Sequence, residues 1–240
     1  SKRLPPAPRG AAYCFLPLPV VTGLPVHVNG YFELSSNRRD IWSGSDMVGD
    51  GELRANWNKA LVEELAASCY TRVLVAAKAA LGGGGAYEAL WPTGSTAEGS
   101  MWRGLADSLM RLVRPLPLLQ TRSAIAGGWV APQKCVVWTG GGVNGGGEGN
   151  ERELRALAEV LLAENVPLVE GSKELRSLLL SSGCATFSTT PAFVRQLFRR
   201  LASPAPGRLA ARGVGSGAVG ANGTASLRSG NPSARSTCIL

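Results

Sequence analysis

Apolar residues recur along this chain with the two periods that distinguish strands from helices. Val26 and Val28 flank one polar position, which predicts a β-strand, and Gly30 follows as a bulge or a point of close approach. From residue 53 the period changes to four, which predicts a long helix with one packed apolar stripe. The stripe consists of Leu53, Trp57, Leu61, Leu65, Cys69 and Val73. The glycines at 82–85 end this helix.

A second helix is predicted from about Ala97 to Val113, because apolar residues there recur at helical spacing. Pro115 and Pro117 stop it, since proline cannot continue a helix. The inward positions of this helix are Trp102, Leu105, Leu109 and Leu112.

The remainder of the chain alternates short strands with helices. Apolar runs predict strands at 118–119, 129–130, 136–138 and 166–169. Between and after them, helices are predicted to begin at a capping box of Asn150 and Glu153, at the cap Ser172, and at Thr190-Pro191. These patterns predict a mixed α+β fold.

Four segments follow from the same patterns. Residues 1–9 are proline-rich and basic, and predict an extended basic lead-in. Residues 10–115 predict a strand-rich beginning with long amphipathic helices, and 116–201 a small α/β lobe. Residues 202–240 contain mostly glycine, alanine, serine and arginine, which cannot offset the entropy of ordering, so this tail is predicted to be disordered.

The net charge of +8 does not indicate a nucleic-acid-binding surface. Three basic residues precede residue 10 and four follow residue 201, which leaves 18 basic against 17 acidic residues between them. A folded domain that tracks phosphates needs a clustered basic face, so we expect no nucleic-acid partner. No apolar run reaches the ~20 residues of a membrane span, so we expect no membrane partner either. Without an initiator methionine, the chain begins as if cut from a longer one.

The cysteines and the single histidine argue against a metal site. Cys14, Cys69, Cys135, Cys184 and Cys238 show no metal-ligand spacing, and their odd number fits free thiols in a reducing compartment. His27 lies in a predicted strand and is expected to be structural. We therefore expect no bound metal and a cytoplasmic location.

A polar turn with two adjacent arginines is the main candidate site. Adjacent residues of an extended chain point to opposite faces, so either Arg38 or Arg39 could hold the turn while the other faces an anion. Asn37 would orient the loop. The alternative is that both arginines pair only with acidic neighbours, namely Asp40, Asp46 or Asp50.

Four distinctive runs lie in the first 95 residues: Phe-Leu-Pro-Leu-Pro at 15–19, Ser-Asn-Arg-Arg-Asp-Ile-Trp at 36–42, Trp-Asn-Lys-Ala-Leu at 57–61 and Leu-Trp-Pro-Thr-Gly-Ser at 90–95. In these runs the chain resembles the sacsin family of very large chaperone-like proteins. The resemblance extends more weakly over residues 10–201. It implies the domain that follows a heat-shock-type ATPase module, similar to that of the ninety-kilodalton heat-shock chaperone.

The resemblance also implies a function. This chain would be a transducer or client-facing domain in protein quality control and not an enzyme on its own. It would bind no cofactor itself, with ATP held by an upstream domain, and Arg38 or Arg39 would contact the ATP γ-phosphate. The implied partners are the upstream ATPase domain, the seventy-kilodalton heat-shock chaperone and client proteins.

Two other classes of function remain open. Gly140, Gly142 and Gly145 satisfy the G-x-G-x-x-G pattern after an apolar strand, which indicates a dinucleotide-binding enzyme domain. Against it, the capping box puts the next helix at Asn150, beyond the final glycine. A passive protein-interaction scaffold is the other alternative.

Overall fold

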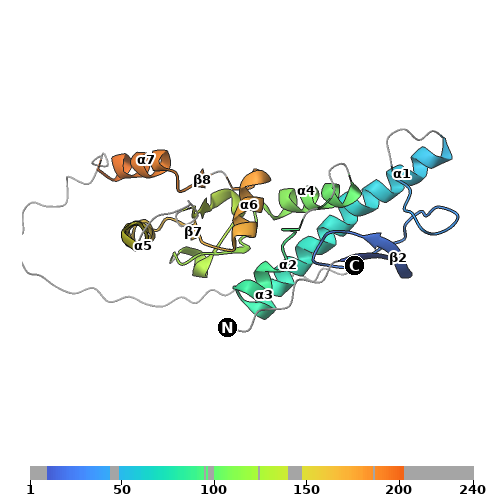
Figure 1. Ribbon diagram of the computed structural model, residues 1–240, viewed down its shortest axis with the longest axis horizontal. Helices are drawn as coiled ribbons and strands as arrows, with labels where there is room; N and C mark the ends of the chain where they lie inside the picture. Colours follow the sequence, from blue (N-terminus) through green and yellow to red (C-terminus); the bar gives the residue numbers. More distant parts are fainter. Residues whose placement is uncertain are drawn as a thin grey trace, which may run out of the picture. The chain divides into compact units, whose positions relative to one another are not determined.

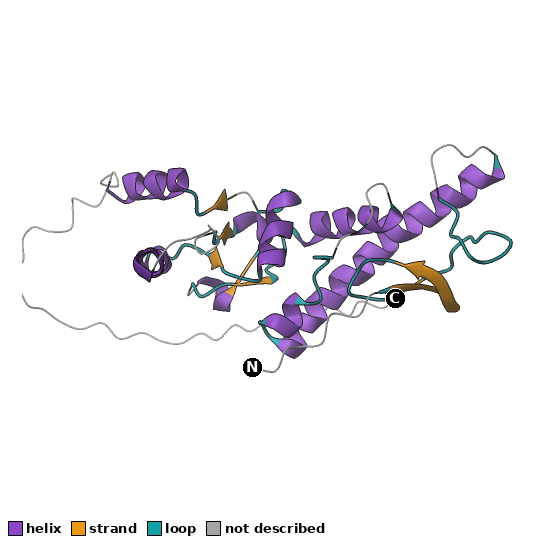
Figure 2. Cartoon of the chain, in the orientation of Figure 1, coloured by secondary structure: helices purple, strands orange, loops and turns teal. Residues whose placement is uncertain are grey.

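The structure of the chain, a computed structural model, describes residues 10–43, 49–94, 96, 100–123, 125–139, 148–185 and 187–202. By their contacts, residues 1–198 form one unit and 199–240 another. Figure 1 follows the chain by colour, and Figure 2 separates helices, strands and loops. The predicted basic lead-in and disordered tail lie outside the described residues.

The chain begins with a three-stranded sheet in the order β2-β1-β3. β1 (Ala11–Cys14) pairs antiparallel with β2 (Leu16–Val21) and parallel with β3 (Val28–Asn29). Pro17 and Pro19 lie in β2, an edge strand, where a missing backbone N–H breaks no central ladder. The predicted strand at Val28 is therefore present, as the opposite edge of this sheet.

The predicted long helix is present as three consecutive elements. These are α1 (Asp50–Ala60), the π-helical η1 (Leu61–Ala66) and α2 (Ala67–Leu81). At the end of η1, the N–H of Ala67 reaches back five residues to the carbonyl of Val62. Gly82 ends the helix as predicted, with a φ of 67° that favours glycine.

The predicted apolar stripe of this helix is wrong, because it does not face the core. Leu53 is 72% exposed, Trp57 52% and Leu65 61%. The buried positions lie mainly one residue later, at Asn58, Val62, Tyr70 and Leu74. One residue of an α-helix corresponds to a rotation of about 100°, so the four-residue spacing identified a helix but not its buried face.

The second predicted helix is α4 (Met101–Val113), which begins later than Ala97. It starts at Met101 because the hydroxyl of Ser100 accepts a hydrogen bond from the N–H of Arg103 and caps the first turn. Trp102, Leu105 and Leu109 are buried as predicted, whereas Leu112 is exposed and Val113 is buried in its place. The short helix α3 (Gly85–Glu88) and its Tyr87 pack between the long helix and the following segment.

The next part of the chain forms a two-stranded ribbon. β4 (Leu119–Gln120) pairs antiparallel with β5 (Trp129–Val130), as the apolar runs predicted. The 3₁₀ turns η2 (Ile125–Gly128) and η3 (Pro132–Lys134) precede and follow β5.

A three-stranded parallel sheet follows, in the order β7-β6-β8. Its strands are β6 (Val136–Val137), β7 (Leu168–Val169) and β8 (Phe187–Ser188), the last of which the sequence did not predict. α5 (Glu148–Ala163), α6 (Lys173–Ser181) and α7 (Pro191–Ala202) follow these strands in turn. Parallel strands require such crossovers, and helices commonly supply them.

Among α5, α6 and α7, the structure confirms two predicted starts and corrects one. Ser172 caps α6 by accepting a hydrogen bond from the N–H of Leu175 at 3.2 Å, and α7 begins at Pro191. By contrast, α5 begins at Glu148, which is two residues before Asn150, the start that the capping box predicts. The helix therefore starts directly after the glycine run.

The main core joins the first sheet, the long helix and α4 with part of the second half. Buried side chains of this cluster include Phe32, Trp91, Trp102, Val137 and Leu179. A smaller cluster around Leu161 lies between α5 and the parallel sheet. These helices and small sheets confirm the predicted mixed α+β fold. Among the described residues, no helix is both long and apolar enough to traverse a bilayer.

Candidate functional site

The arginine turn is closed by hydrogen bonds between its own residues. Leu34 and Ile41 form an isolated antiparallel bridge at its base. Inside it, the hydroxyl of Ser35 donates to Oδ1 of Asn37 at 2.7 Å, and the same oxygen accepts from the N–H of Arg39 at 3.0 Å. The Asn37 side chain therefore stabilises the backbone conformation of the turn that carries both arginines.

The two arginines of this turn have different environments. Arg38 has a φ of 57°, in the left-handed region, and its guanidinium donates to the carbonyl of Cys14 at 3.3 Å. This contact fastens the turn to the end of β1. Arg39 is exposed, and neither arginine forms an ion pair with a described acidic residue. The expected partner Asp40 is not used, and Asp46 lies outside the described residues.

An apolar groove runs between residues 26–31 and the exposed face of the long helix. Its volume is about 560 Å³. The helix side of the groove includes Trp57, Leu61, Leu65, Cys69 and Val73. These are residues of the mispredicted stripe, so the sequence located the lining of the groove but assigned it to the core. We call this feature the apolar groove below.

Trp57 fixes one end of the apolar groove. Its indole N–H donates to the carbonyl of Tyr31 at 3.0 Å, which ties the helix to the segment after β3. Beyond Trp57 a second hollow of about 470 Å³ continues past Leu53. The Arg54 guanidinium lies 5.7 Å from the centre of the Trp42 ring nearby.

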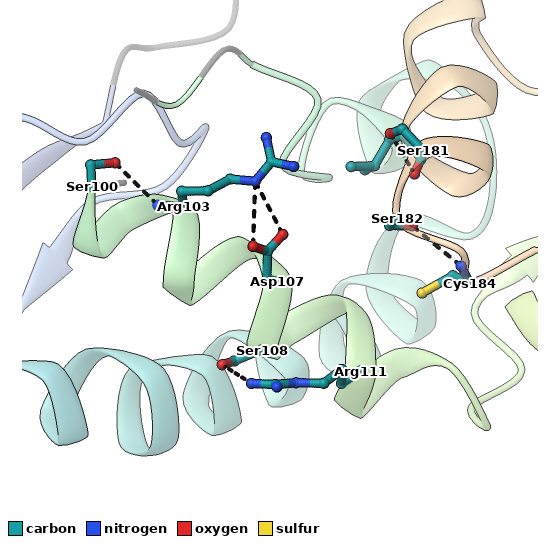
Figure 3. Close-up of polar contacts among 9 residues, drawn as sticks. Ser100, Arg103, Asp107, Ser108, Arg111, Ser181, Ser182 and Cys184 are labelled. Atoms are coloured by element: carbon teal, nitrogen blue, oxygen red, sulfur yellow. Dashed lines mark hydrogen bonds and ion pairs between the residues drawn. The ribbon is translucent and has the colours of Figure 1, made fainter. Parts of the chain in front are cut away.

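A separate polar cavity of about 360 Å³ lies between α4 and α6 (Figure 3). Arg103 and Asp107 of α4 form a 3.1 Å ion pair on one wall, and Ser181 and Ser182 lie across from them. The charged groups of the lining are balanced, because Lys173 and Glu174 accompany this pair. The sequence did not predict this cavity, since it depends on two helices about 70 residues apart meeting in space.

His27 has a structural position. Its Nδ1 accepts a hydrogen bond from the N–H of Ala11 at 3.0 Å, and its ring meets Tyr13 edge-on at 5.5 Å. No group of three or more metal-ligating side chains occurs within the described ranges. Of the cysteines described there, Cys69 is exposed and Cys14, Cys135 and Cys184 are buried. Burial raises the pKa of the Cys135 thiol to about 12, which makes it a poor nucleophile.

The glycine motif Gly140, Gly142 and Gly145 lies outside the described residues. What the structure describes is its flanks. β6, the central strand of the parallel sheet, precedes the motif, and α5 follows it. Just after β6, the hydroxyls of Thr139 and Thr189 lie 3.0 Å apart, which joins the carboxyl ends of β6 and β8.

Comparison with known proteins gives one informative similarity. A segment of 67 residues is 46% identical to human sacsin. It makes up 28% of this chain and 1% of sacsin, so the chain matches a very small part of that protein. No protein-family model matches the sequence. No solved structure matches it either.

The chain thus contains a sacsin-related segment. This similarity is shorter than the resemblance expected over residues 10–201. It supports a sacsin-like region and leaves the role of the remaining residues to be proposed.

Proposed function

We propose that this chain is a sacsin-like fragment of a molecular chaperone or co-chaperone, which acts in cytoplasmic protein quality control after an upstream ATPase domain. The observation that carries the proposal is the 67-residue segment that is 46% identical to human sacsin. The exposed apolar face of the long helix supports a client-facing role, because large exposed apolar patches mark interaction sites. The chain is not an enzyme on its own. Its partners are the upstream ATPase, client proteins and the seventy-kilodalton heat-shock chaperone.

Within this proposal, Arg39 contacts the γ-phosphate of ATP held by the upstream domain. Arg38 is occupied by the carbonyl of Cys14, whereas Arg39 is exposed on a turn that Asn37 keeps in place. A guanidinium on a held turn loses little freedom when it meets a phosphate. It would stabilise charge that develops during phosphoryl transfer.

ATP turnover of the chain joined to its upstream ATPase domain tests this role. We expect Arg39→Ala to lower the turnover number about tenfold or more, with a smaller change in nucleotide affinity. Arg38→Ala should mainly lower the melting temperature, because it removes the contact to Cys14. Arg72→Ala changes an exposed arginine of α2 and serves as the matched control. Unchanged turnover in a folded Arg39→Ala protein would contradict the phosphate role.

A dinucleotide-binding domain is the second candidate, favoured by the parallel sheet. The order β7-β6-β8 places a reversal of connection between β6 and β8, and open α/β sheets bind ligands at the carboxyl ends of strands beside such a reversal. The glycine motif follows β6 directly in sequence. A fluorescence titration with NADH and NADPH tests it, and the absence of saturable binding would exclude it. An upstream ATPase that the chain does not stimulate, together with no cofactor binding, would favour the passive scaffold.

A further inference from the structure

Within the part of the chain that the structure describes, one wall of the apolar groove is a strand edge that pairs with no other strand. β3 is the outer strand of its sheet, and the N–H of Gly30 donates to the carbonyl of Tyr13 of β1 at 3.0 Å. Backbone groups of successive strand residues point in opposite directions, so the N–H and carbonyl of Asn29 face away from β1. Asn29 itself lines the groove. An edge of this kind is a template for another strand.

The far end of the same edge is already paired, by side chains of the helix. The Trp57 indole donates to the carbonyl of Tyr31 at 3.0 Å. The Asn58 amide bonds to both the N–H and the carbonyl of Glu33, each at 2.8 Å. The helix therefore takes the place of a neighbouring strand at residues 31 and 33. Among the described residues, the edge is left without such a partner where it faces the groove.

The opposite wall of the groove presents exposed apolar side chains of the long helix. Leu65 is 61% exposed and Val73 46%, and both line the groove from the long helix. A strand placed between an open edge and such a helix face gains backbone hydrogen bonds on one side and buries alternate side chains on the other. This combination suits an extended peptide better than a second globular surface.

The charged residues around the groove favour a peptide of positive charge. Glu64 lines the groove itself, and the hollow that continues past Trp57 is lined by Glu33 and Asp50 with one cation, Arg54. The lining of the groove and of this hollow therefore contains three carboxylates and one guanidinium. Basic residues in the bound segment would complement them.

We propose that the apolar groove binds an extended peptide segment of another protein, with apolar residues at alternate positions and basic residues between them, which adds a strand to β3. This inference deepens the proposed function. It rests on that function in one respect, namely that the peptide belongs to an unfolded client. The binding step itself needs neither ATP nor the upstream ATPase. Its outcome is therefore separable from that of the turnover experiment.

Fluorescence anisotropy with the full chain tests the proposal. The probe is a fluorescein-labelled peptide of about nine residues that alternates valine with lysine, long enough for one typical strand. We expect saturable binding, and affinity reduced on the order of tenfold by the double change Leu65→Ser and Val73→Ser. Val75→Ser is the matched control, because Val75 is 47% exposed on α2 but does not line the groove. Equal melting temperatures of the variants establish that the fold is unchanged.

Two modified peptides separate strand addition from simple apolar adsorption. One carries N-methyl groups on the valines and the other on the lysines, so each removes the N–H donors of one edge. We expect one of the two to lose binding, since a peptide added to β3 uses only one edge. A peptide with glutamate in place of lysine should bind more weakly, because Glu33, Asp50 and Glu64 repel it.

Three results would overturn the proposal. The first is no saturable binding of the lysine–valine peptide. The second is equal binding of both N-methylated peptides and the parent, which would show adsorption to an apolar surface. The third is a concentration-dependent dimer, in sedimentation, that Leu65→Ser and Val73→Ser abolish, which would make a second copy of the chain the occupant. Peptide binding with no effect of Arg39→Ala on turnover would retain this inference and contradict only the ATPase role.

Discussion

The side-chain amide of Asn58 pairs with the backbone of Glu33 as a neighbouring β-strand would. Its oxygen accepts from the N–H of Glu33 at 2.8 Å and its nitrogen donates to the carbonyl of Glu33 at 2.8 Å. The same nitrogen donates to the carbonyl of Trp42 at 2.9 Å. Asn58 is fully buried, so one polar side chain joins the long helix to both ends of the arginine turn.

Replacing Asn58 should therefore destabilise the whole chain. Asn58→Leu leaves the N–H of Glu33 and the carbonyl of Trp42 without the partners they have in the fold, while the carbonyl of Glu33 keeps its bond from the N–H of Trp42. We expect the free energy of unfolding to fall by about 2–4 kcal/mol. Asn58→Asp keeps the acceptor but loses the donor, so it should also be destabilising. Urea denaturation measures both. Lys59→Ala, at the exposed neighbouring position, is the control. Equal losses of unfolding free energy for Asn58→Leu and Lys59→Ala would contradict the role of Asn58.

The two tryptophans Trp57 and Trp91 should differ in their contribution to stability. Trp91 is fully buried and meets Tyr87 edge-on at 6.4 Å, so Trp91→Ala should lower the free energy of unfolding by about 3–5 kcal/mol. Trp57 is 52% exposed and makes one hydrogen bond to Tyr31, so Trp57→Ala should lower it by only about 1 kcal/mol. Thermal denaturation of both variants checks the difference. A loss of unfolding free energy for Trp57→Ala as large as that for Trp91→Ala would show that the stripe contributes to the core.

Stability should decline in alkaline solution. Burial raises the pKa of Cys135 from 9.0 to about 12, and burial raises that of Tyr87 from 10.0 to about 12. Because both pKa values are higher in the folded chain, their contribution to stability is complete below pH 9.0 and is lost as the pH rises toward about 12.

Denaturant unfolding at a series of pH values measures this decline. Cys135→Ala should reduce its slope above pH 9.0, because the alanine has no proton to lose. Cys69→Ala, at an exposed cysteine of α2, is the matched control and should leave the slope unchanged. Equal slopes in wild type and Cys135→Ala would show that the buried thiol does not contribute.

Removal of the C-terminal tail should leave the folded unit intact. The buried hydrophobic residues that the structure describes lie between Ala12 and Ala185. Truncation after Leu201 removes none of them, so we expect the melting temperature to stay nearly unchanged. Differential scanning fluorimetry compares the two chains, and a fall of several degrees would show that the tail packs.

Part of the candidate site was predictable from local sequence. The arginine turn at 35–40 was identified because its residues are neighbours along the chain. Which arginine is held was not predictable, since Arg38 bonds to the carbonyl of Cys14, 24 residues away. The polar cavity between α4 and α6 and the apolar groove depend on side chains that only the fold brings together.

The sequence by itself determined the mixed α+β class and several helix ends. A four-residue period is a local property of the helix, and Gly82 and Ser172 act on the turns beside them. Tertiary structure alone decided which face of the long helix is buried. Which face is buried depends on the element that packs against the long helix. Opposite Glu63 that element is α4, where Gly104 has no side chain and so lets the Glu63 side chain approach closely.

The same reason explains the misassigned stripe. At η1 the helix changes its hydrogen-bond pattern, and Asn58 turns one face toward Glu33 and Trp42. An apolar pattern records which side chains avoid water, but not whether the chain's own core or another chain covers them. The stripe from Leu53 to Val73 is apolar in sequence and largely exposed in the fold, because the helix packs into the core through Val62, Tyr70 and Leu74 instead. The bonds of Asn58 to Glu33 and Trp42, which are distant in sequence, add to this orientation.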